Sequence, residues 1–155
     1  MKKTLRITAG VAMVATLLLA ACASDNEDVT SGLAQGNEPR PAWQLPANLY
    51  ENFEATMAVQ VTLQEELLAT ASDDDLMCAT IGGELRALTT LQRTAGVVYF
   101  PLVIAGNSNS GSVSLSYYSA RLKRTFTLTD WMPFSPGISP TSDEDGRPYV
   151  VTFNY

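Results

Sequence analysis

Three stretches of the chain alternate between apolar and polar residues. The longest covers residues 53–63, and residues 112–118 and 123–128 repeat the pattern. Successive side chains of a strand point to opposite faces, so a period of two predicts half-buried strands. The residues expected to face the core are Phe53, Met57, Val59, Val61 and Leu63 in the first stretch, Val113, Leu115 and Tyr117 in the second, and Phe126 and Leu128 in the third.

A pair of glycines, Gly82 and Gly83, separates two short β-prone runs. Glycine readily adopts the positive φ of a two-residue hairpin turn, so this spacing predicts a β-hairpin over residues 76–88. The expected cross-strand pairs are Thr80 with Leu85, Cys78 with Ala87 and Ala79 with Arg86, which would make Cys78 a small core residue.

The long apolar run at residues 97–104 also fits a strand. Pro101 lies inside it and cannot donate to a ladder, so we expect this strand to be bulged or to lie at a sheet edge. Tyr149, Val151 and Phe153 predict a last strand over residues 149–153, whereas residues 65–71 fit either a helical turn or a continued strand.

Turn signals divide the remainder. Residues 131–140 are rich in Pro and Gly and predict a loop that carries aromatic side chains, and residues 141–148 predict a polar turn. Short strands at this spacing, without a convincing long helix, predict an all-β fold. We expect a single antiparallel β-sandwich over residues 41–155, with an open barrel as the alternative.

The N-terminus has the order of a secretory signal. Lys2, Lys3 and Arg6 precede thirteen uncharged residues, 7–19. Thirteen residues at about 1.5 Å each span roughly 20 Å, which is less than a hydrocarbon core of about 30 Å. Leu19-Ala20-Ala21-Cys22 resembles the bacterial lipobox. That resemblance implies removal of a signal peptide at residues 1–21 and lipidation of Cys22, which would anchor the protein to the membrane.

Residues 22–40 predict a flexible acidic tether, because they contain few apolar side chains and no aromatic ones. The acidic start at residues 24–28 resembles the export signals that follow the lipidated Cys in surface lipoproteins of some Gram-negative anaerobes, with a solvated spacer as the alternative. The expected location is the cell envelope, anchored to the outer membrane on either its periplasmic or its external face.

Composition excludes several function classes. Without the three N-terminal cations, seven Lys and Arg face sixteen Asp and Glu, a net charge of −9 that disfavours nucleic-acid binding. The chain has no His, which removes His-based triads, His-based metal sites and the commonest general base. We therefore expect no enzymatic activity and no cofactor.

Part of the domain resembles a known module. Residues 74–76, 79–87, 102–107 and 117–120 together resemble a small β-domain of secreted and lipid-anchored proteins of Gram-negative anaerobes, so that the similarity spans about residues 78–120. The chain departs from its pattern at Thr80, Leu85 and Ala87, where the module has an aromatic residue, a Cys and a Gly. The resemblance implies an extracytoplasmic β-module without a particular activity.

Two groups of residues are candidate sites. Asp73, Asp74 and Asp75 could bind Ca²⁺ if acids of residues 143–145 converged on them, and a hydrated turn is the alternative. A ligand platform could form from Tyr118, Trp131, Phe134 and Asn107, since aromatic side chains with polar neighbours favour interfaces. The sequence therefore predicts a non-enzymatic binding or structural lipoprotein. The alternatives are a glycan-binding accessory of polysaccharide capture and an adhesion or assembly subunit with an envelope-protein partner.

Overall fold

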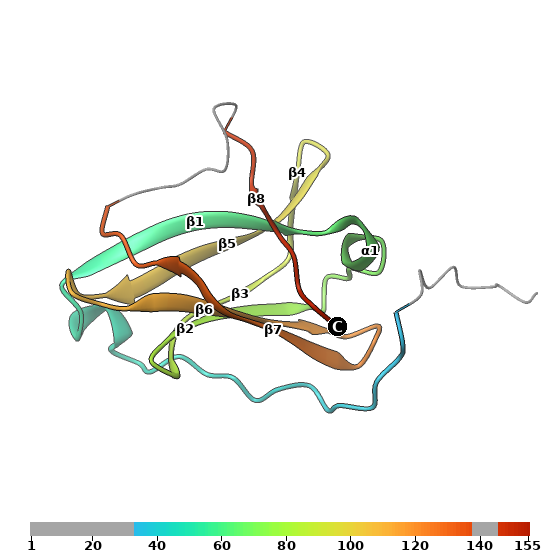
Figure 1. Cartoon of the computed structure of the whole chain (residues 1–155), viewed down its shortest axis with the longest axis horizontal. Helices are drawn as coiled ribbons and strands as arrows, with labels where there is room; N and C mark the ends of the chain where they lie inside the picture. The colour runs from blue at the N-terminus through green and yellow to red at the C-terminus, as the bar shows by residue number, and fades with distance from the viewer. Residues whose placement is uncertain (1–32, 138–145) are drawn as a thin grey trace, which may run out of the picture.

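A computed structural model describes residues 33–137 and 146–155. Within these residues the chain forms two four-stranded sheets packed face to face (Figure 1). The β-sandwich predicted from the alternating pattern is therefore confirmed. The first sheet has the order β4-β5-β1-β8, with β1 Ala55–Leu63, β4 Gln92–Thr94, β5 Val97–Gly106 and β8 Tyr149–Val151. The second has the order β3-β2-β6-β7, with β2 Leu76–Ile81, β3 Glu84–Thr90, β6 Ser112–Ser119 and β7 Arg124–Pro133.

The first sheet follows the alternation closely. Along β1 the apolar positions from Met57 to Leu63 are buried, while the residues between them lie toward the outer face. Strand β4 pairs with β5 only along residues 97–99, so β5 is an edge strand at Pro101, as its missing N–H requires. Strand β8 runs parallel to β1, unlike the other paired strands described.

The second sheet contains the predicted Gly82-Gly83 hairpin, but its register is only partly as expected. Thr80 pairs with Leu85 as predicted, whereas Ala79 pairs with Ala87 and Cys78 with Leu88. The reason is a β-bulge in which Arg86 is an extra residue between two ladder pairs. Sequence alternation cannot anticipate one inserted residue, and every pair beyond it shifts by one.

Aromatic side chains fill the centre of the sandwich. Tyr117 packs edge-on against Phe100 at 5.8 Å between ring centroids and stacks on Phe126 at 5.9 Å. Phe153, beyond the end of β8, packs against both Tyr117 and Phe126. This core joins both sheets to the C-terminal segment, because each ring comes from a different strand or segment.

The N-terminal part of the domain, which we call the strap (residues 33–48), is held on the domain. The Gly36 N–H donates to the Leu122 carbonyl at 2.7 Å and the Glu38 N–H to the Lys123 carbonyl at 2.9 Å. Figure 1 shows this segment running along the second sheet on the side away from the first. The prediction of a flexible tether is therefore wrong for residues 33–40, because the turn between β6 and β7 supplies backbone partners. Residues 1–32, with the predicted signal peptide and Cys22, lie outside the described residues.

The strap explains the position of Cys78. Leu76, Cys78 and Tyr118 lie on the outer side of the second sheet, outside the main core cluster, yet Cys78 is only 2 % exposed. The Tyr118 hydroxyl donates to the Glu38 carbonyl, and Arg40 donates to the Asp74 carbonyl. The burial predicted for Cys78 is therefore confirmed, but the thiol lies on the outer side of the second sheet, along which the strap runs, and not in the main core cluster.

Two connections complete the chain. Residues 65–71 contain a helical turn, α1 Glu65–Leu68, and the helix η1 Leu49–Glu51 leads from the strap toward β1. Strand β7 continues to Pro133, so the predicted loop at residues 131–140 begins three residues later than expected, and most of the predicted turn at residues 141–148 lies outside the described residues. No helix in the described parts of the chain is long and apolar enough to cross a membrane.

Candidate functional site

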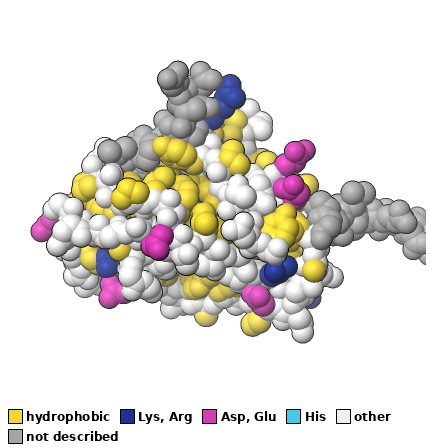
Figure 2. Space-filling model, in the orientation of Figure 1, with side chains coloured by type: hydrophobic (Ala, Val, Ile, Leu, Met, Phe, Trp, Pro, Cys, Tyr) yellow, Lys and Arg dark blue, Asp and Glu magenta, His cyan; other side chains and the backbone are white. Residues whose placement is uncertain are grey.

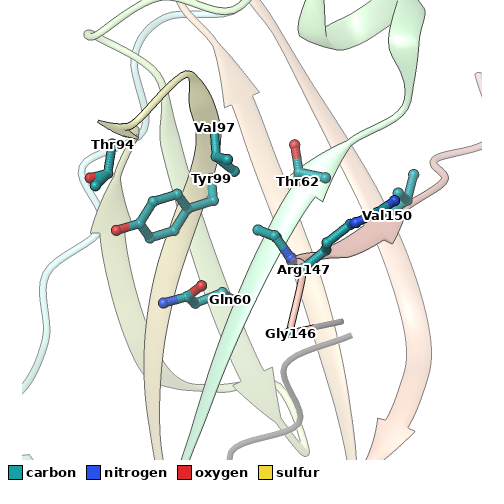
Figure 3. Close-up of a pocket in the computed structure, with 9 residues that line it drawn as sticks. Gln60, Thr62, Thr94, Val97, Tyr99, Gly146, Arg147 and Val150 are labelled. Atoms are coloured by element: carbon teal, nitrogen blue, oxygen red, sulfur yellow. The ribbon is translucent and has the colours of Figure 1, made fainter. Parts of the chain in front are cut away.

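One candidate site is a groove of about 620 Å³ on the outer face of the first sheet (Figure 3). We refer to it as the outer groove. Its floor comes from β1 and β5, one wall from β4 and the other from the residues that lead into β8. The lining residues are Gln60, Thr62, Thr94, Val97, Tyr99, Gly146, Arg147, Pro148 and Val150.

Strand alternation and a tight turn build this groove. Gln60 and Thr62 are the outward residues of β1, between inward-facing Val59, Val61 and Leu63. The β4–β5 connection is a two-residue turn in which Ala95 and Gly96 both have positive φ, 49° and 80°. Such a turn reverses the chain sharply and places Thr94 directly across from Val97 at the rim of the groove.

The groove combines one aromatic ring with hydroxyl, amide and guanidinium groups. In Figure 3 the Thr94, Tyr99 and Gln60 side chains lie on one side, with Arg147 and Val150 on the other. None of the described lining side chains is a carboxylate, a thiol or a primary amine. Such a surface can stack on a flat apolar face and hydrogen-bond to hydroxyl groups, but it offers no conventional nucleophile or general base.

Apolar side chains continue around the groove. Val97, Val103 and Val150 are all exposed, although they belong to strands of the sandwich. Figures 1 and 2 view the sandwich from the side, with the first sheet uppermost, and Figure 2 shows hydrophobic side chains gathered where Figure 1 draws β1 and β8. The outer face of the first sheet is therefore suited to contact rather than to simple hydration.

The four residues of the predicted ligand platform do not form one surface. Tyr118 is 5 % exposed beneath the strap, and Phe134 is 6 % exposed with its ring packed on Gly106. Trp131 is half-buried and packs edge-on against Tyr149. Tyr118 also lies six residues along β6 from the end near Phe134, a separation of about 20 Å.

Asn107, the fourth residue of that platform, has a structural role in its loop. Its side-chain oxygen accepts a hydrogen bond from the Glu54 N–H at 3.2 Å, and its own N–H donates to the Ser110 hydroxyl at 2.8 Å. These bonds tie the β5–β6 loop to the start of β1. The surface aromatic residue of the outer groove is Tyr99, which is inconspicuous in the sequence because it lies within the apolar run of β5.

Asp75 is fully buried and satisfied by protein donors. Its Oδ2 accepts from the Tyr117 hydroxyl at 2.6 Å and the Ser72 N–H at 2.9 Å, and its Oδ1 accepts from the Ala120 N–H at 2.8 Å and the Ser72 hydroxyl at 2.9 Å. Asp73 instead pairs with Arg93 at 3.2 Å. A cation at Asp75 would have to displace these donors, so the geometry favours the turn over the calcium site. The acids at residues 143–145 lie outside the described residues.

Two buried groups are poorly suited to nucleophilic chemistry. Burial raises the pKa of the Cys78 thiol to about 11, partly offset by hydrogen bonding with Ser116. Burial, and next the charge of Asp75, raises the pKa of the Tyr117 hydroxyl far above its usual value. Neither group therefore ionises near neutral pH, and we interpret both as residues that stabilise the fold.

A second pocket, of about 390 Å³, lies where η1 meets the turn between β2 and β3. We call it the Arg86 pocket. Arg86 reaches it from the bulge, and its guanidinium stacks over the Phe53 ring at 3.8 Å. The remaining lining residues are Gln44, Pro46, Leu49, Asn52, Glu84 and Leu85. No pattern in the sequence indicates this site, because a one-residue bulge creates it.

Comparisons of the chain with protein-family models, with curated proteins and with solved structures find no match. The resemblance of residues 78–120 to a β-module of secreted and lipid-anchored proteins therefore stays a prediction.

Proposed function

We propose that this protein is a lipid-anchored binding protein of the cell envelope, without enzymatic activity, and that it captures glycans in the outer groove. The observation that carries this proposal is the composition of the groove, in which Tyr99 lies with Gln60, Thr62 and Thr94 on an exposed sheet face. The predicted lipobox at Cys22 supports the proposed location in the cell envelope, and the outer groove supports glycans as the ligand class.

The groove fits the two kinds of surface that a sugar ring presents. The C–H face of a pyranose is apolar and stacks on an aromatic ring, a contact to which Tyr99 is suited. The ring hydroxyls need donors and acceptors at its edge, which the amide of Gln60 and the hydroxyls of Thr62 and Thr94 supply. The volume, about 620 Å³, lies in the usual range for small-ligand sites.

The same lining argues for capture rather than hydrolysis. Glycoside hydrolysis generally uses two carboxylic acids placed on either side of the bond that is cut. The described lining of the outer groove contains none, and the whole chain lacks His. Among the described residues that line the groove, a bound glycan would therefore meet no general acid or base.

The test of the groove is glycan binding by the mature lipidated protein, purified in a detergent without a sugar headgroup. We expect Tyr99→Ala to weaken binding about tenfold, since an aromatic contact contributes about 0.5–1.5 kcal/mol in addition to the apolar area it buries. The matched control is Tyr155→Ala, which removes an equally large side chain, 55 % exposed, away from the groove. Capture of an envelope protein with no glycan affinity, or equal losses in both variants, would reject glycan capture at this site.

The test of the address uses Cys22→Ser and protease treatment of intact cells. We expect the wild-type protein to incorporate labelled fatty acid and to fractionate with the outer membrane, and Cys22→Ser to do neither. Loss of the domain from intact cells, while a periplasmic control protein survives, is the result expected if the groove captures external polysaccharide. Fatty-acid labelling that persists in Cys22→Ser would contradict the lipobox.

A further inference from the structure

Arg86 is a buried cation with most of its hydrogen-bonding capacity unused. The residue is 9 % exposed, and its single recorded polar partner is the Glu84 carboxylate, 2.7 Å from Nη2. The Nε and Nη1 atoms are each buried and have no hydrogen-bond partner. An arginine carries five N–H donors, of which three belong to these two nitrogens.

Such an arrangement lacks an acceptor. Buried polar groups in folded proteins are nearly always hydrogen-bonded, and a buried charge has the strongest requirement. The stacking of the guanidinium on Phe53 stabilises its charge but supplies no acceptor for the N–H groups in the plane of the guanidinium. Arg86 itself lines the adjoining Arg86 pocket, so an acceptor bound in that pocket could complete its hydrogen bonding.

We propose that the Arg86 pocket binds a small ligand through a carboxylate group, which takes the place of Glu84 on the guanidinium. A carboxylate matches the fork of an arginine in a planar, bidentate geometry, and Glu84 already demonstrates that a carboxylate fits against Nη2. The Glu84 side chain is 74 % exposed, so it can move to solvent when a ligand enters. Its departure opens the approach to the guanidinium.

The rest of the pocket suits a compact molecule with an apolar part. Pro46, Leu49 and Leu85 line the pocket with apolar groups, while Gln44 and Asn52 contribute amides. This site is independent of the outer groove. It lies at the start of β1, beside Phe53, whereas the groove uses the far half of the same strand.

The experiment is a titration of the mature lipidated protein with glucuronate, followed through the Arg86 side-chain Nε–H resonance and, in every variant, through the backbone N–H resonance of Leu85, which also lines the pocket. Glucose is the neutral probe of the same size, and inorganic phosphate is the probe for a general anion site. We expect a saturable shift with glucuronate, a weaker effect of phosphate and none of glucose. Glu84→Ala removes the internal competitor and should tighten glucuronate binding by up to about fivefold, the factor that an exposed ion pair contributes.

Arg86→Lys keeps the charge but loses the fork, and we expect it to weaken glucuronate binding at least about tenfold. The matched control is Arg124→Lys, since Arg124 also stacks on an aromatic ring, Phe126, at 5.1 Å. If Arg86→Lys does not fold, the comparison of Glu84→Ala with the wild-type protein decides. The proposal is overturned by no saturable shift in either of those two proteins, by equal responses to glucose, or by tighter binding of phosphate than of glucuronate.

Discussion

Replacing Asp75 by Asn tests how strongly this buried carboxylate stabilises the fold by joining Ser72, before β2, to Tyr117 and Ala120 at the end of β6. Each of its two oxygens accepts one backbone N–H and one hydroxyl: Ser72 N–H with the Tyr117 hydroxyl on Oδ2, and Ala120 N–H with the Ser72 hydroxyl on Oδ1. Asparagine offers an oxygen on one side only. Whichever way the amide is turned, its NH₂ group faces one hydroxyl, which can rotate to accept, and one backbone N–H, which cannot.

The magnitude follows from that geometry. One buried backbone N–H loses its acceptor, which costs about 1–3 kcal/mol, and the remaining bonds weaken because the acceptor is no longer charged. An amide also avoids part of the cost of burying a carboxylate, which offsets some of this loss. We expect Asp75→Asn to lower the free energy of unfolding by about 3 kcal/mol, or the melting temperature by roughly 10–20 °C.

Urea denaturation measures this change in the free energy of unfolding in four proteins: the wild type, Asp75→Asn, Tyr117→Phe and the double variant. Tyr117→Phe keeps the ring in the core and removes one donor, so it should cost about 1–2 kcal/mol, and the double variant should cost clearly less than the sum. Asp73→Asn is the matched control in the same turn, and because Asp73 is exposed it should cost less than about 0.5 kcal/mol. A loss below about 1 kcal/mol in Asp75→Asn, or additive losses in the double variant, would refute the reasoning.

Two further predictions concern the strap and the thiol beneath it. A Cβ on Gly36 would lie 2.5 Å from the Lys123 carbonyl oxygen, so Gly36→Ala should displace the strap, lower the free energy of unfolding in urea by about 1–3 kcal/mol and speed proteolysis of the strap. A Cβ on Gly111 would meet open space, so Gly111→Ala is the control and should leave stability unchanged. Equal losses in the two variants would contradict a docked strap. The pKa of Cys78 is raised from 9.0 to about 11, so the unfolded chain loses this proton first and stability should fall between pH 9 and 11, by about 2–3 kcal/mol for this group. Cys78→Ala should remove that part of the decline, and identical pH profiles for the two proteins would show that the thiol is not buried as described.

The fold was predictable to the extent that the pattern is local. Alternation along β1 and β6, and the Gly82-Gly83 turn, correctly predicted strands and a hairpin, because strand periodicity and positive φ depend on neighbouring residues alone. The bulge at Arg86 was not predictable in this way. The amino-acid composition of a strand does not show where a bulge lies. Beyond the bulge, however, the side chains that would have faced the core face the opposite side of the sheet.

The docking of the strap and the positions of the candidate sites could not be predicted from the sequence, for a different reason. Residues 33–40 have the composition of a tether, yet Gly36 and Glu38 form backbone bonds with Leu122 and Lys123, far along the chain. Composition reports how much apolar surface a segment can bury and says nothing about backbone partners supplied elsewhere. The predicted platform failed similarly, because Tyr118 is covered by the strap whereas Tyr99, within an apolar run, lines a groove.

The docked strap also limits how the domain can stand on a membrane. If Cys22 is lipidated as predicted, ten residues separate it from Leu33, which is buried in the core, and each of the eleven steps from Cys22 to Leu33 extends at most about 3.3–3.6 Å. The domain would therefore stay within about 40 Å of the bilayer. The strap meets the turn between β6 and β7, at the end of the sandwich where β1 finishes, so that end would lie nearest the membrane. The Arg86 pocket lies at the opposite end, beyond the roughly 30 Å length of β1, so in this arrangement it would face away from the membrane.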